Sequence, residues 1–142
     1  MSKLPDKASE LIMLALSDLN TIRSTEGYKI DMENWHLPLG QSERTCYVCL
    51  AGSVMANTLK AGFKERMAPH YYPEDIADKL SSLDDFRQGW VYSGLLKLGV
   101  STSVTAKRKG SDYYPVVPYW EDPEGFFRSM TDLANHLAMR GL

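Results

Sequence analysis

The sequence predicts a mainly α, or α+β, domain of about five helices around a central apolar helix, with two or three short strands. Two observations support this class. Apolar residues recur at three- and four-residue steps in several long segments, whereas patterns typical of strands are few and short. The chain has 142 residues, the usual size of one domain. We therefore expect residues 1–142 to form a single globular unit.

The first expected helix begins at Pro5 and Asp6 and ends before Gly27. Proline fits the first turn of a helix, and a carboxylate there lies near the positive end of the helix dipole. The apolar positions form one stripe at helical spacing: Ala8, Leu11, Ile12, Ala15, Leu19 and Ile22. Three neighbouring apolar residues at positions 13, 14 and 16 widen this stripe, which predicts burial on two sides or a subunit contact.

A short strand and a central helix are expected next. Tyr28, Ile30 and Met32 alternate with charged residues, as in a half-buried strand. Residues 34–44 contain proline and glycine and are expected to form a loop. Residues 45–60 are apolar nearly all round and include the small side chains of residues 51–53, so we expect a core helix that other elements approach closely.

The second half of the chain predicts three more helices. One begins at Pro73 and buries apolar positions between residues 76 and 83. Ser82 and Asp85 have the spacing of a capping box, which predicts a further helix over residues 84–98. Residues 100–106 are rich in β-branched side chains and are expected to form a strand. The last helix begins at Asp122-Pro123 and is followed by Gly141.

Composition and charge limit the classes of partner. A formal net charge of -2 gives no overall attraction to nucleic acids or acidic membranes. The longest apolar run, Leu11 to Leu16, is far shorter than the roughly 20 residues of a membrane span. The N-terminus lacks the pattern of a signal peptide, and two cysteines cannot build a secreted disulfide framework. We therefore expect a cytoplasmic protein with no membrane association.

The Cys46-Tyr47-Val48-Cys49 motif has three interpretations. A structural zinc site needs four ligands, but a second cysteine pair or a histidine pair is absent from the sequence. Redox chemistry of the thioredoxin type requires an exposed pair at a helix N-terminus after a buried strand, and here a polar loop is expected before the pair. The favoured interpretation is that both cysteines are buried on a core helix.

No other pattern predicts catalysis or a cofactor. His36 with Cys46 and Cys49 superficially matches a zinc deaminase, but that chemistry needs a glutamate two residues after the histidine, where Pro38 stands. Ser53 lacks the second glycine of a nucleophile elbow. The glycines at 89, 94 and 99 do not form a phosphate-binding loop. We therefore expect a non-enzymatic protein without a cofactor.

The segment 107–121 is the strongest functional candidate. It combines three cations with aromatic side chains, namely Lys107, Arg108, Lys109, Tyr113, Tyr114, Tyr119 and Trp120. Cations bind phosphates and flat rings stack on bases, so this mixture suits a single-stranded nucleic acid. Tyrosine, tryptophan and arginine also anchor protein interfaces. A third interpretation is purely structural, with the rings folded back over the helices and the cations solvated.

One stretch resembles small uncharacterised proteins encoded by bacteriophages. It comprises Asp31-Met32-Glu33-Asn34-Trp35-His36 and the run Cys46-Tyr47-Val48-Cys49-Leu50-Ala51-Gly52-Ser53-Val54-Met55-Ala56, and it depends on the Trp-His pair and the Cys-x-Val-Cys-Leu-Ala-Gly-x-x-Met-Ala pattern. Small phage proteins commonly bind a host or phage protein, so the resemblance implies an accessory role in the host cytoplasm. The leading hypothesis is a binding protein that acts through protein contacts and can self-associate. The alternatives are single-stranded nucleic-acid binding through 107–121 and a zinc or redox protein using Cys46 and Cys49.

Overall fold

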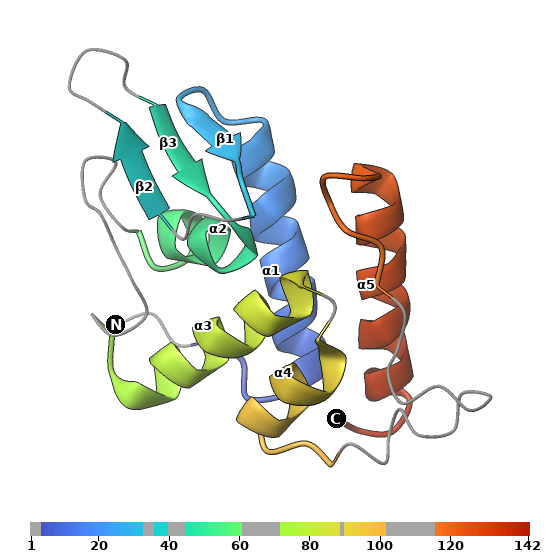
Figure 1. The fold of residues 1–142 in the computed structure, drawn as a ribbon. Coiled ribbons are helices and arrows are strands. Elements are labelled where there is room, and N and C mark those ends of the chain that lie inside the picture. Colours follow the sequence, from blue (N-terminus) through green and yellow to red (C-terminus); the bar gives the residue numbers. More distant parts are fainter. Residues whose placement is uncertain (1–3, 33–35, 40–44, 61–71, 89, 102–115) are drawn as a thin grey trace.

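The computed structural model describes residues 4–32, 36–39, 45–60, 72–88, 90–101 and 116–142. Within these ranges it contains five helices and one three-stranded sheet (Figure 1). The helices and strands occur in the order α1 Ala8–Arg23, β1 Tyr28–Ile30, β2 His36–Leu39, β3 Thr45–Val48, α2 Leu50–Asn57, α3 Glu74–Arg87, α4 Val91–Lys97 and α5 Pro123–Ala138. The predicted class, mainly α with a few short strands, is confirmed.

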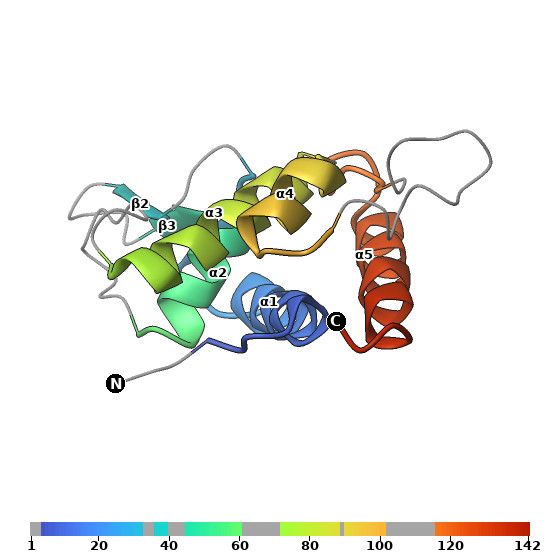
Figure 2. The same ribbon diagram turned by 90° about the horizontal axis from the view of Figure 1, so that it is seen from below.

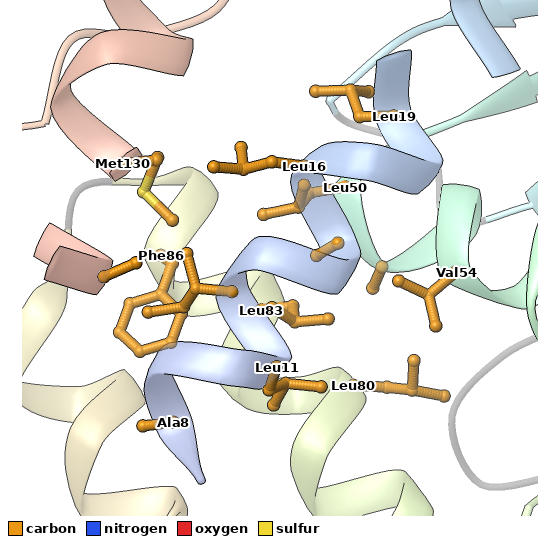
Figure 3. Packing of buried hydrophobic residues seen from close by; sticks show 14 of the residues in the cluster. Ala8, Leu11, Leu16, Leu19, Leu50, Val54, Leu80, Leu83, Phe86 and Met130 are labelled. Atoms are coloured by element: carbon orange, nitrogen blue, oxygen red, sulfur yellow. The ribbon is translucent and has the colours of Figure 1, made fainter. Parts of the chain in front are cut away.

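Helix α1 lies in the middle of the molecule, between α2 on one side and α5 on the other (Figure 2). Its apolar stripe is buried together with Leu16, but Met13 is 44% exposed and Leu14 is only partly buried, so the stripe is narrower than the sequence predicts. Side chains of α2, α3 and α5 surround it, including Val54, Leu83 and Met130 (Figure 3). Full burial of one such side chain contributes roughly 1.5–3 kcal/mol to stability.

Helices α1 and α5 pack in antiparallel orientation, and a polar contact marks each end of the pair. At one end, Ser9 Oγ donates a hydrogen bond of 2.5 Å to the carbonyl oxygen of Leu142. At the other end, Arg23 Nη1 lies 3.3 Å from Glu124 Oε1. The end of α1 therefore lies beside the beginning of α5, which is the region where the predicted aromatic segment joins the helix.

The sheet places its strands in the order β1-β3-β2, with β1 parallel and β2 antiparallel to β3. Two predictions were wrong here. Thr45–Val48 forms the central strand rather than the beginning of a helix, and His36–Leu39 pairs with it inside the expected loop. β-Branched and aromatic side chains favour a pleated strand once neighbours are present on both sides. Proline at position 38 is tolerated because β2 lies at the sheet edge.

Helix α2 is shorter than predicted but has the predicted character. All residues from Leu50 to Met55 are buried. The small residues Ala51, Gly52 and Ser53 have essentially no exposed surface. Since α2 packs extensively against α1, their small volume allows the two helices to approach closely. α2 thus occupies the core as expected and shares the central position with α1.

The helix predicted over residues 84–98 was also wrong. α3 continues to Arg87, and α4 begins only at Val91. Ser82 does not cap a new helix, because it is buried within α3 and its hydroxyl donates to the carbonyl oxygen of Lys79. The chain turns where the amides of Gln88 and Trp90 both donate to the carbonyl oxygen of Asp85.

The strand predicted at residues 100–106 lies largely outside the described residues. The two that are described, Val100 and Ser101, do not belong to a strand. The last helix was predicted correctly, from Pro123 in its first turn to Gly141 just beyond its end.

The contact between α3 and α4 generates a stability prediction. A methyl group on Gly94 would lie 2.5 Å from Cε1 of the fully buried Phe86 ring. Because the ring cannot move away freely, we expect Gly94→Ala to lower the free energy of unfolding by about 1–3 kcal/mol, despite the better helix propensity of alanine. Urea denaturation measures the change. Leu96→Ala, at an exposed position of the same helix, should change stability by less than about 0.5 kcal/mol.

Candidate interaction surface

The two cysteines lie at a junction between a strand and a helix. Cys46 belongs to β3, and Cys49 is the N-cap residue of α2, where its Sγ accepts a hydrogen bond of 3.3 Å from the amide of Gly52. The expected core helix therefore does not contain Cys46, and a strand rather than a polar loop precedes Cys49. A cysteine at a helix N-terminus directly after a strand is placed as in a thioredoxin-type redox motif, which the sequence did not predict. Whether such a thiol reacts depends on its exposure to solvent.

Burial and packing favour a structural role for both thiols. Neither sulfur is accessible, and the two cysteines pack in different apolar clusters: Cys46 with Ile22 and Val48, Cys49 in the main core. Burial raises the pKa of Cys46 to about 11. It raises the pKa of Cys49 to about 12, although the Gly52 amide counteracts this. At neutral pH both remain protonated, and the reactive thiolate form is scarce.

No group of three or more histidine, cysteine, aspartate or glutamate side chains that could hold a metal occurs among the described residues. In the same part of the chain, no buried side-chain nitrogen or oxygen lacks a hydrogen-bond partner. Of the described helices, none is both long enough and apolar enough to span a membrane. The buried polar side chains of the described residues are therefore all hydrogen-bonded.

Asp18 is a buried carboxylate that joins α1 to the end of α2. Its Oδ1 accepts a hydrogen bond of 2.7 Å from Asn57 Nδ2, and its Oδ2 accepts one of 2.5 Å from the hydroxyl of Thr58. Burial raises the pKa of Asp18, while the two hydrogen bonds and the charge of Lys60 counteract the increase. Since both carboxylate oxygens already accept from the protein, we interpret Asp18 as a structural link.

Asp85 links α3 to α4 in a similar way. Its Oδ2 lies 2.7 Å from both the hydroxyl of Ser93 and Nζ of Lys97. The same Nζ lies 3.0 Å from the hydroxyl of Ser81. This network closes the two-helix unit across its turn. The hydroxyls of Ser81 and Ser93 and Nζ of Lys97 therefore serve the contact between the two helices.

The predicted segment 107–121 is described only in its last part. Lys107, Arg108, Lys109, Tyr113 and Tyr114 lie outside the described residues. Tyr119 and Trp120 are described, and they differ sharply from each other. Tyr119 is partly buried against the core, whereas 80% of the surface of Trp120 is exposed.

Tyr119 is held by the aromatic rings at the beginning of α5. Its ring centroid lies 5.8 Å from that of Phe126 and 6.4 Å from that of Phe127, with both pairs in edge-to-face geometry. Phe126 is fully buried. Such pairs contribute roughly 0.5–1.5 kcal/mol each beyond the area they bury. The residue immediately before Trp120 is therefore fixed to the helix.

Hydrogen bonds of the backbone anchor the other described residues of the segment. The amide of Val117 donates a hydrogen bond of 3.0 Å to the hydroxyl of Ser129, and the amides of Glu121 and Asp122 both donate to the carbonyl oxygen of Pro118. The chain thus runs along α5, turns and enters the helix, as Figure 1 shows in orange. Trp120 lies within this turn.

Arg23 connects the same region to α1. Its guanidinium carbon lies 4.5 Å from the ring centroid of Phe127, in the geometry of a cation–π contact. The side chain also bonds to Asn20 and Glu124. Arg23 therefore covers one aromatic ring of the cluster that supports Tyr119. The sequence did not point to it, because an isolated arginine at the end of a helix matches no motif.

We define the Trp120 surface as Trp120 with the exposed residues Glu121, Asp122, Glu124, Arg23 and Arg128. Tryptophan and arginine are the residue types that most often anchor protein contacts, and here a fixed turn presents the tryptophan. Trp90 is also exposed, at 57%, but it lies at the turn before α4 and no aromatic neighbour supports it among the described residues. The Trp120 surface is the strongest candidate site that the described residues present.

Comparison with known proteins provides no precedent: no family model, no curated protein and no solved structure matches the chain. The function therefore has to be inferred from the geometry of the residues themselves.

The buried carboxyl group of Asp18 generates a prediction about pH. Its raised pKa means that the folded state binds more protons than the unfolded state near the carboxyl pKa, so this group favours folding less as the pH rises. Asparagine keeps the two contacts, because its amide can accept from Asn57 and donate to the Thr58 hydroxyl. We expect Asp18→Asn to gain stability relative to the native protein between about pH 4 and pH 7.

The measurement is the free energy of unfolding of both proteins across this range. Asp132→Asn changes the same charge at an exposed position of α5 and serves as the control. The interpretation is contradicted if the native protein becomes more stable relative to Asp18→Asn as the pH rises.

Proposed function

We propose that this protein is a non-enzymatic binding protein and that the Trp120 surface contacts a partner protein. The observation that carries the proposal is the opposite behaviour of two adjacent aromatic residues. Tyr119 packs on Phe126 and Phe127, and this packing fixes the turn that exposes Trp120. A rigid tryptophan buries a large area on binding and loses little conformational entropy, so it is an efficient anchor.

The chemistry of the buried polar groups supports a role without catalysis. Asp18 and Asp85 accept hydrogen bonds from neighbouring helices or from their own two-helix unit. Cys46 and Cys49 have raised pKa values and no access to solvent. None of these groups combines exposure with the activated state that a nucleophile or a general base needs.

The origin and location of the protein are part of the same proposal. The resemblance of the Trp35-His36 and Cys46–Ala56 stretch to small phage proteins supports a phage-encoded accessory protein. Such a protein acts in the host cytoplasm on a host or phage protein. A second copy of the chain is one form that the protein partner can take.

Single-stranded nucleic acid is the alternative ligand of this surface. An exposed indole can stack on a base, and the cations at 107–109 precede it in the sequence. This alternative requires affinity that falls steeply with added salt, because binding would release counterions from the phosphates. A protein contact built around one aromatic anchor requires no such slope.

Substitution of Trp120 tests the proposal. We expect Trp120→Ala to lose the specific partner in a pull-down from phage-infected cells and to weaken binding by at least 2 kcal/mol, about 30-fold, because the anchor is removed. Trp90→Ala removes an exposed tryptophan elsewhere and should keep the partner. Circular dichroism and urea denaturation should show both variants folded, since neither side chain belongs to the core.

Two results would overturn the proposal. One is retention of every specific partner by Trp120→Ala. The other is binding of single-stranded DNA at low salt that depends on Trp120 and disappears as salt is added, which would favour the nucleic-acid alternative.

A further inference from the structure

The residues around Trp120 carry an asymmetric distribution of charge. Glu121, Asp122 and Glu124 follow the tryptophan within four positions, and all three are exposed. The side chains of Asp122 and Glu124 are 50% and 68% exposed, respectively. Three of the four residues that follow Trp120 in the sequence therefore carry exposed carboxylates.

The cations of this surface already have partners. Arg23 pairs with Glu124 at 3.3 Å and also contacts Phe127, and Arg128 pairs with Asp122 at 3.5 Å. Glu121 has no ion-pair partner among the residues that the structure describes. Among the described residues that define the Trp120 surface, three carboxylates and two guanidinium groups give a formal net charge that is negative.

The two existing ion pairs can exchange with those of a ligand. Pairs between exposed groups contribute only about 0–1 kcal/mol, because water screens both charges. A cation brought by a ligand can therefore share Asp122 or Glu124 without a large loss of stability. Glu121 is available for a new pair, whereas an acidic ligand would meet like charge on this side of the indole.

We propose that the Trp120 surface binds a protein segment that carries lysine or arginine, with one cation over the indole face and others paired with Glu121 and its neighbours. This inference rests on the proposed function, because it names the chemistry of the partner at the same surface. Tryptophan is the best aromatic partner for a cation, and a neighbouring carboxylate attracts the same cation. Complementary charge also selects against acidic partners.

Peptide titration of the full chain tests the inference. The probe is a short peptide of alternating lysine and serine, and its match replaces every lysine with glutamate. The indole N–H signals of the three tryptophans are followed by NMR, and Trp120→Phe identifies the signal of Trp120. We expect the lysine peptide to shift this signal saturably, and we expect added salt to reduce the shift. The glutamate peptide should leave the Trp120 signal unchanged, and the lysine peptide should leave the Trp90 signal unchanged.

Charge reversal locates the acidic partner groups. We expect Glu121→Lys to weaken binding of the lysine peptide by at least roughly three- to fivefold, because one exposed ion pair is lost and a like charge is added. Glu10→Lys makes the same change at an exposed position near the opposite end of α1 and should leave binding unchanged.

Three results would overturn the inference. They are a lysine peptide without effect on the Trp120 signal, equal effects of the two peptides, and equal weakening by the Glu121 and Glu10 variants. A Trp120 signal that changes on dilution of the protein alone would indicate a second copy on this surface and would also overturn it. If Trp120→Ala loses the natural partner while the lysine peptide has no effect, the inference fails and the proposed function stands.

Discussion

The burial of helix α1 on two opposite sides is the constraint on which the rest of the structure depends. Leu11, Ile12 and Leu19 have no exposed surface, because α2 and α5 cover opposite sides of the helix. A helix with so broad an apolar surface cannot remain exposed in water, and one neighbour cannot cover it. This requirement places α5, which is last in the sequence, directly beside the first helix.

The antiparallel contact between α1 and α5 in turn creates the Trp120 surface. It brings Arg23, at the end of α1, over the ring of Phe127 at the beginning of α5. Phe126 and Phe127 then support Tyr119, and the fixed turn after Tyr119 presents Trp120. The surface is therefore a consequence of core packing, and its charge comes from the acidic residues that suit the beginning of a helix.

The sequence predicted the long helices well because their apolar residues repeat over many positions. α1 and α5 each extend over 16 residues, so the periodic signal is strong. The prediction failed for Thr45–Val48, because four residues are too few to distinguish a strand from a helix. Pairing with two other strands decides the structure of this segment. The boundary between α3 and α4 was missed because backbone bonds to Asp85, rather than a capping side chain, terminate α3.

The candidate site was predicted only in part, and for a similar reason. Aromatic composition identified Tyr119 and Trp120 as equivalent, since adjacent rings look alike in a sequence. Their difference arises from Phe126 and Phe127, which lie on one side of the turn. The role of Arg23 depends on a contact across about a hundred positions, and residue spacing carries no information about it.

The measurement that tests this view most directly is the backbone mobility of residues 118–122 by ¹⁵N relaxation, combined with the solvent accessibility of the Trp120 indole. We expect the turn to show order parameters near 0.85, as in α5, together with an indole that a neutral quencher reaches freely. Order parameters below about 0.6 in the turn, or an indole protected from the quencher, would contradict a rigidly presented tryptophan.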